Sequence, residues 1–473
     1  MVRTAILLAS LLAVACDKPK AAPDAAVHLD AGAGVDGPPT EHKDVPVTIN
    51  RDLDLLFLVD DSPSMADKQV NLRANFPNFI NVLNALPGGL PNLHLGVIST
   101  DLGTMGAGDS APGPAIGSGP GACNGMGKSG NLVINGAPIT GNFLIDVATG
   151  TGTRMTNYTG TLAAAFAAMA NSGSGGCGFE QHLEAIRRAL GNNAQNAGFL
   201  RTTALLAIVI LTDEDDCSIA HSTMFGPDQA TLGVLSSFRC TRFGVTCDTG
   251  GTTSDEMNQV GTKASCHSNE ASQFMTHVQD YVQFVRGLKA NPADVIVAAI
   301  SGPPTPVATE LRSPGAGGAA IPALTHSCNY TGAMGLEVAD PGVRLQQFLD
   351  GFPDRSSFST VCQQDLSGGL AQIAQLITNT IGTSCFTNPL ADIDPSTPGS
   401  QFGCTVADVT NEGKPNETRV TLPACDASLS NKPCWHIVID NVNCASGDHE
   451  ALKIERTTMP AADVHVVADC VIP

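Results

Sequence analysis

The chain has few aromatic residues and few basic ones. Its 473 residues include 1 Trp, 3 Tyr and 17 Phe, and 25 Lys and Arg stand against 45 Asp and Glu, which gives a formal net charge of −20. Because this charge repels phosphate backbones and anionic headgroups, and no basic cluster offsets it, we expect no nucleic-acid partner. The scarcity of Trp and Tyr also leaves few platforms on which bases or sugars could stack.

Paired Cys-x-x-Cys motifs are absent, which argues against a zinc cluster or a thiol redox motif. The chain nevertheless contains 15 Cys. Setting Cys16 aside leaves 15 − 1 = 14, of which eight lie between Cys123 and Cys362 and six between Cys385 and Cys470. Both subsets are even. This pattern predicts seven disulfides and an oxidising compartment outside the cytoplasm.

No apolar run is long enough to span a membrane, but the N-terminus is typical of an export signal. Arg3 precedes the apolar residues 5–15, which end in small residues directly before Cys16. This arrangement resembles the lipobox of bacterial lipoproteins. It implies that residues 1–15 are a cleaved signal peptide and that Cys16 carries a lipid, so the only membrane contact is a lipid anchor. An ordinary secretory signal with a chance Cys is the alternative.

The expected location is the bacterial cell envelope, on the periplasmic side or at the cell surface. Residues 16–48 are rich in Ala, Pro, Asp and Gly and have almost no large apolar side chains. Such a composition cannot bury a core, so this segment is predicted to be a flexible linker behind the lipidated Cys.

The most informative motif follows the apolar residues 53–59, which predict a buried strand. Asp60, Ser62 and Ser64 come directly after it with the spacing Asp-x-Ser-x-Ser. One carboxylate and two hydroxyls in a tight loop are hard oxygen ligands, the type that Mg²⁺, Mn²⁺ and Ca²⁺ prefer. A Ser- and Asp-rich turn that only caps the next helix is the alternative.

This motif resembles the metal-ion-dependent adhesion site (MIDAS) of the von Willebrand factor A (VWFA) domain. That family is a doubly wound α/β fold, and its site adds an Asp that follows a later central strand. Here the apolar residues 204–211 lead into Thr212 and Asp213, so Asp213 takes that position. Glu214 stands where the family usually has Gly, which is a departure. Asp215 and Asp216 follow, and we expect them to be exposed, with a second cation as the alternative.

The family also supplies a Thr from a second loop, and this chain departs from that pattern. The family spacing leads to Cys177 or to Glu180, depending on the helix residue from which it is counted. Cys177 in an exported protein favours a disulfide. Glu180 is either a direct metal ligand or an acidic residue favoured by the dipole of the next helix.

Predicted strands and helices alternate over residues 49–384. Further strands are expected at residues 93–100 and 293–300, with short ones at 131–134 and 143–146. Residues 65–86 predict an amphipathic helix with Val70 on its buried face and a kink or break at Pro77. The expected fold class is α/β, with a doubly wound, mostly parallel VWFA-like sheet. Residues 385–473, with six Cys, predict a small disulfide-rich β module.

The expected function is therefore that of a lipid-anchored binding protein rather than an enzyme. The VWFA resemblance implies that Mg²⁺, or Mn²⁺ or Ca²⁺, held by Asp60, Ser62, Ser64 and Asp213, with Glu180 as a further ligand, engages an Asp or Glu of a protein partner. Two alternatives stay open: a metal-dependent hydrolase that uses the same acids to activate water, and a metal-free envelope scaffold.

Overall fold

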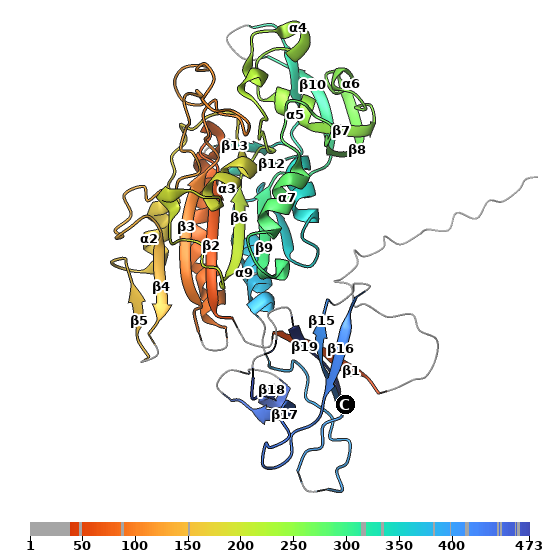
Figure 1. Ribbon diagram of the computed structural model, residues 1–473. Coiled ribbons are helices and arrows are strands. Elements are labelled where there is room, and N and C mark those ends of the chain that lie inside the picture. Colours follow the sequence, from red (N-terminus) through yellow and green to blue (C-terminus); the bar gives the residue numbers. More distant parts are fainter. Residues whose placement is uncertain are drawn as a thin grey trace, which may run out of the picture. The chain divides into compact units, whose positions relative to one another are not determined.

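Four strands expected from the sequence, at residues 53–59, 93–100, 204–211 and 293–300, become neighbours in one sheet of the computed structural model (Figure 1). Within the described residues this sheet has seven strands in the order β14-β9-β6-β2-β3-β4-β5. The five strands from β14 to β3 are parallel, whereas β4 pairs antiparallel with β3 and β5 pairs antiparallel with β4. Their bounds are β2 Asp52–Val59, β3 Asn92–Ser99, β4 Leu144–Ala148, β5 Arg154–Thr156, β6 Leu205–Leu211, β9 Val295–Ser301 and β14 Ser356–Thr360.

The structure describes most of the chain after residue 37. The described residues are 38–46, 50–86, 89–149, 152–313, 318–332, 335–381, 384–397, 399–411, 416–441, 444, 447–458, 460 and 464–473. The expected signal peptide, Cys16 and most of the expected linker lie outside them. Within these ranges, no helix combines the length and apolar character needed to cross a membrane.

Helices cover both faces of the sheet (Figure 1). Because successive side chains of a strand point to opposite faces, Phe57 packs into one core and Leu58 into the other. The first core includes α1 (Ala66–Asn84), α2 (Leu162–Met169) and α9 (Ser367–Ile381); the second includes α3 (His182–Leu190), α7 (Val278–Arg286) and α8 (Val343–Asp350). The predicted α/β class with a mostly parallel, two-sided sheet is confirmed.

Local details differ from the predictions. Helix α1 is not broken at Pro77, whose side chain faces solvent. Val70 is 51% exposed rather than buried, because Leu72, Phe76 and Phe79 define the buried face and Val70 lies on the opposite side. Residues 131–134 do not form the expected strand; only the amide of Val133 bonds to the sheet, at the Val97 carbonyl.

Long connections between these elements carry small β structures. One four-stranded sheet has the order β11-β10-β8-β7, and β12 and β13 form a hairpin. The bounds are β7 Val245–Thr249, β8 Gly261–Ser268, β10 Val307–Arg312, β11 Ile321–Leu324, β12 Cys328–Gly332 and β13 Gly335–Ala339, with the short helices α4 Gln229–Leu232, α5 Phe238–Gly244 and α6 Ser254–Met257.

All 14 Cys from Cys123 onward are paired, as predicted. The pairs are Cys123–Cys177, Cys217–Cys240, Cys247–Cys266 and Cys328–Cys362, followed by Cys385–Cys444, Cys404–Cys470 and Cys425–Cys434. Seven disulfides indicate an oxidising location outside the cytoplasm. The expectation that Cys177 is a disulfide partner rather than a metal ligand is confirmed.

The C-terminal module is rich in β structure, as expected, but it includes one strand from the N-terminal side. Strand β1 (Thr40–Pro46) pairs with β19 (Val464–Val471), which pairs in turn with β15 (Cys404–Thr410) and β16 (Thr418–Leu422). A separate pair joins β17 (Cys434–Ile439) and β18 (Glu450–Glu455). The segment 16–48 was expected to be flexible throughout. Residues 40–46 correct that expectation, because their backbone groups pair in the sheet and Val45 enters the module's core.

Candidate functional site

The candidate site lies where three parallel strands end at the same edge of the central sheet. Strand β2 has β3 on one side and β6 on the other, so the chain reverses its direction of winding between them. Crevices at such switch points, beyond the carboxyl ends of the strands, are the usual ligand sites of open α/β sheets. Asp60 follows β2, and its buried carboxylate accepts hydrogen bonds from Thr212 Oγ1 after β6 at 2.7 Å and from Thr100 Oγ1 after β3 at 3.4 Å.

The four residues predicted from the Asp-x-Ser-x-Ser motif and the later strand are joined by hydrogen bonds. The Ser62 amide donates to Asp60 Oδ1 at 2.8 Å, and the Ser62 and Ser64 hydroxyls lie 3.1 Å apart. Ser64 Oγ then donates to Asp213 Oδ1 at 3.0 Å. Asp60, Ser62 and Asp213 are buried, whereas Ser64 is exposed, so solvent reaches this cluster at Ser64.

Lys68, which the sequence analysis did not identify, supplies a positive charge to this cluster. It lies in the first turn of α1, and its Nζ is 2.9 Å from Asp213 Oδ2, 2.6 Å from Glu337 Oε2 and 3.0 Å from the Ser64 carbonyl oxygen. Burial disfavours the charged ammonium, but the neighbouring Asp213 and Glu337 outweigh burial and raise the pKa of Lys68. The spacing of four residues between Ser64 and Lys68, one helical turn, is the only local signal of this contact.

The pKa values of both carboxylates in the cluster, Asp60 and Asp213, are raised. Burial raises the pKa of Asp60 to about 7, and the charge of Asp213 adds to this rise, while hydrogen bonds from Ser62 and Thr212 oppose it. Burial also raises the pKa of Asp213 in spite of Lys68. The ammonium of Lys68 pairs with Asp213 and Glu337, whereas Asp60 forms no ion pair within the described residues.

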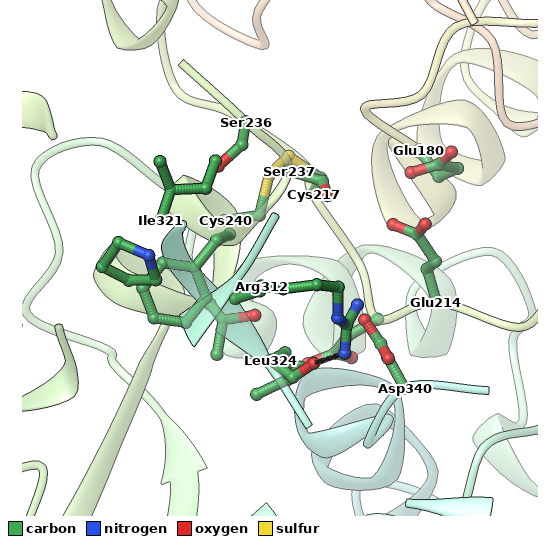
Figure 2. A pocket seen from close by; sticks show the side chains of 15 residues that line it. Glu180, Glu214, Cys217, Ser236, Ser237, Cys240, Arg312, Ile321, Leu324 and Asp340 are labelled. Carbon is green, nitrogen blue, oxygen red and sulfur yellow. Dashed lines mark hydrogen bonds between the residues drawn. A yellow bond between two sulfur atoms is a disulfide. The ribbon is translucent and has the colours of Figure 1, made fainter. Parts of the chain in front are cut away.

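Glu180 does not join the hydrogen-bonded chain from Asp60 to Asp213. Its closest acidic neighbour is Glu214, and Figure 2 shows the two side chains facing each other. Glu180 is 1% exposed, and its Oε1 has no hydrogen-bond partner. Burial raises its pKa well above the usual value, and the charges of Glu214 and Asp60 act in the same direction.

Asp215 and Asp216 do not form the exposed acidic loop that was expected. Asp215 Oδ1 accepts the amides of Arg344 and Leu345 at the start of α8, at 3.0 and 3.1 Å. Asp216 is buried, and its Oδ2 lies 3.0 Å from the buried guanidinium of Arg344. Both carboxylates are thus engaged with the protein itself.

The donor chemistry of the cluster fits a divalent cation. Asp60, Ser62, Ser64 and Asp213 offer two carboxylates and two hydroxyls, which are hard oxygen ligands. The single charge of Lys68 does not balance both carboxylates, and buried charges require compensation. Among the described residues, no three His, Cys, Asp or Glu are grouped as metal ligands, so a cation here needs the Ser hydroxyls. The ammonium of Lys68 would compete with the bound cation for Asp213.

Comparisons with known proteins give little further information. No protein-family model and no curated protein matches the chain. Among solved structures, the human COPII-coat protein Sec24c is similar with a TM-score of 0.32 and 8% sequence identity. The match covers 92% of this chain and 46% of Sec24c, so the chain spans less than half of that protein. A likeness this distant carries no argument about the function or the partner.

Proposed function

We propose that this protein is a lipid-anchored binding protein of the VWFA type that works outside the cytoplasm. Asp60, Ser62, Ser64 and Asp213 would hold a divalent cation, which would engage an acidic group of a protein partner. The observation that carries this proposal is the hydrogen-bonded convergence of these four residues at the switch point of the sheet. Lipid attachment at Cys16 would keep the protein at the envelope.

A carboxylate is the partner group that best suits such a site. Mg²⁺ takes six ligands and dehydrates reluctantly, so an anionic oxygen from outside is a better additional ligand than a neutral one. The exposed Ser64 marks the side from which that oxygen approaches. Because the chain carries a formal charge of −20, a wholly anionic partner is repelled at long range. The fitting partner therefore presents one Asp or Glu on a neutral or basic surface.

The cation is tested by calorimetric titration of the purified, oxidised protein with Mg²⁺ or Mn²⁺. Asp60→Asn keeps the size of the side chain and removes its charge, and it should weaken binding at least tenfold. Asp280→Asn is the matched control, because that carboxylate on α7 is 64% exposed. Equal affinities for the wild type and the Asp60 variant would refute the assignment, and no binding at all would favour the metal-free scaffold.

The partner is tested by binding in the presence of a chelator. Binding of an envelope protein should vanish in EDTA, return with Mg²⁺ or Mn²⁺, and be lost when one exposed acidic residue of the partner becomes an amide. Binding that survives EDTA unchanged would show that another surface, such as the C-terminal module, makes the contact.

A further inference from the structure

A second acidic feature lies beside the candidate cation site. A cavity of about 90 Å³ is lined at one end by the carboxylates of Glu180, Glu214 and Asp340 (Figure 2). Glu180, predicted from the sequence as a ligand of the adhesion-type site, lines this cavity and lies close enough to Asp60 for the two charges to interact.

Glu180 is the residue that points to a missing ligand. It is 1% exposed, it lines the cavity, and its Oε1 has no hydrogen-bond partner. Buried polar atoms almost always have a partner in a folded protein. The neighbour of Glu180 is a second carboxyl group, Glu214, and the two can share a hydrogen bond when one of them carries a proton. A group with several N–H donors and a positive charge would replace that proton and also reach the unpartnered Oε1 of Glu180.

The guanidinium of Arg312 lies at this end of the cavity, beside Asp340, but it forms no ion pair with Glu180 or Glu214 (Figure 2). No Lys, Arg or His of the described segments forms an ion pair with Glu180 or Glu214. Arg312 lines the same cavity, but its guanidinium donates to the Leu324 carbonyl at 2.6 Å and to Glu310 at 2.9 Å. Asp340, at the same end, pairs with His326 at 2.6 Å.

The rest of the wall combines an apolar part, along which a carbon chain can lie, with the hydroxyl side chains of Ser236, Ser237 and Thr241. Phe238 and Leu324 are buried, and Ile321 and the Cys217–Cys240 disulfide complete the apolar part of the wall. No three acidic, His or Cys side chains in the described part of the chain are grouped as metal ligands, and a metal ion would make no use of the apolar part of the wall. The volume has room for about six to nine groups of the size of water or methylene, at roughly 10–15 Å³ each.

We propose that this cavity binds a primary alkylammonium group. The ammonium lies between Glu180 and Glu214, and the carbon chain runs along Phe238 and Leu324. Two sources share this chemistry: a free diamine and a Lys side chain of a partner protein. Ile321 is only partly buried, and the side chain of Arg312 is 37% exposed, so a ligand can enter from solvent.

The experiment is a titration of the full, oxidised protein with n-butylammonium in EDTA, followed by calorimetry. Glu214→Gln should weaken binding at least tenfold and Glu180→Gln should do the same, because each removes one of the two carboxylates. Asp280→Asn, an exposed change of equal charge, should leave the affinity unchanged. n-Butanol, which has the chain without the charge, should not bind. Circular dichroism and a melting curve establish that each variant is folded.

Two comparisons distinguish this inference from the proposed function. Because the charges of Asp60 and Asp213 act on Glu180 and Glu214, each variant should affect both ligands, but Asp60→Asn should weaken Mg²⁺ binding at least tenfold more than butylammonium binding, and Glu214→Gln should show the reverse. Tighter binding of putrescine than of Nα-acetyl-lysine amide would identify a free diamine as the source, and the opposite order would identify a Lys side chain; either supports the proposal. Equal binding of butylammonium to the wild type and Glu214→Gln, equal binding of n-butanol, or no binding to the wild type would overturn it.

Discussion

Replacing Lys68 by Met tests how the candidate cation site is balanced. The side chain is 1% exposed, and its Nζ contacts Asp213 at 2.9 Å and Glu337 at 2.6 Å. Met preserves most of the aliphatic volume and removes the charge. Because breaking a buried ion pair leaves an uncompensated charge, we expect the free energy of unfolding in EDTA to fall by about 3–5 kcal/mol.

A divalent cation should restore part of this loss. With Lys68 gone, Asp213 has no ammonium beside it and is free to serve as a cation ligand. A ligand that binds only the native state adds about 2.7 kcal/mol at a concentration 100 times its Kd, and each tenfold gain in affinity adds about 1.4 kcal/mol. Mg²⁺ should therefore stabilise Lys68→Met more than it stabilises the wild type.

The assay is urea unfolding followed by circular dichroism, in EDTA and in saturating Mg²⁺. Lys453→Met is the matched control, because that side chain is 59% exposed and its loss should cost about 0–1 kcal/mol. If Lys68→Met is as stable as the wild type in EDTA, the ammonium does not compensate the buried acids. If Mg²⁺ stabilises both proteins equally, Lys68 and the cation do not share Asp213, and the reasoning fails.

Three further predictions concern other features of the chain. In EDTA the free energy of unfolding should fall as pH rises from about 4 to about 7, because the folded state holds a proton on Asp60, whose pKa is raised to about 7 from its usual 3.8. Urea unfolding across this pH range should show the fall, and Asp60→Asn should remove most of it. Phe57→Ala should lower the free energy of unfolding by about 3–5 kcal/mol, because Phe57 packs against Phe76 and Phe166 in the buried core; an unchanged urea midpoint would contradict this. Mass spectrometry of envelope protein without reductant should find seven disulfides and a lipid on Cys16, whereas many free thiols would contradict the compartment.

The central sheet was predictable because its strands are buried on both faces. Such strands read as continuous apolar runs, and four of them in β2, β3, β6 and β9 were found within one or two residues of their ends. The residues that follow β2 and β6 were predictable for the same reason. The carboxyl ends of parallel neighbours meet at one edge of a sheet, so Asp60 and Asp213 lie near each other once the strands are paired.

The contacts that complete the cluster had no comparable sequence signal. Glu337 reaches Lys68 from the β13 hairpin, 269 residues further along the chain, and no periodic pattern encodes that distance. Thr100 and Thr212 were visible as strand ends, but hydroxyls at strand ends are common. Among its described side chains strand β1 buries only Val45, so its composition is that of a linker, and it is held in the sheet by backbone pairing with β19.

In the loop after β6, the four consecutive acidic residues 213–216 have different partners, which their sequence alone does not reveal. Asp213 turns toward Ser64 and Lys68, and Glu214 turns toward Glu180. Asp215 accepts the first amides of α8, while Asp216 holds the buried guanidinium of that helix's Arg344. The last two carboxylates fasten the loop to α8. Asp215 and Asp216 have hydrogen-bond partners in α8, so they fix the loop and keep Asp213 and Glu214 in place in spite of the repulsion between neighbouring acidic groups. A fixed position of this kind is what Asp213 or Glu214 needs in order to bind a cation from outside.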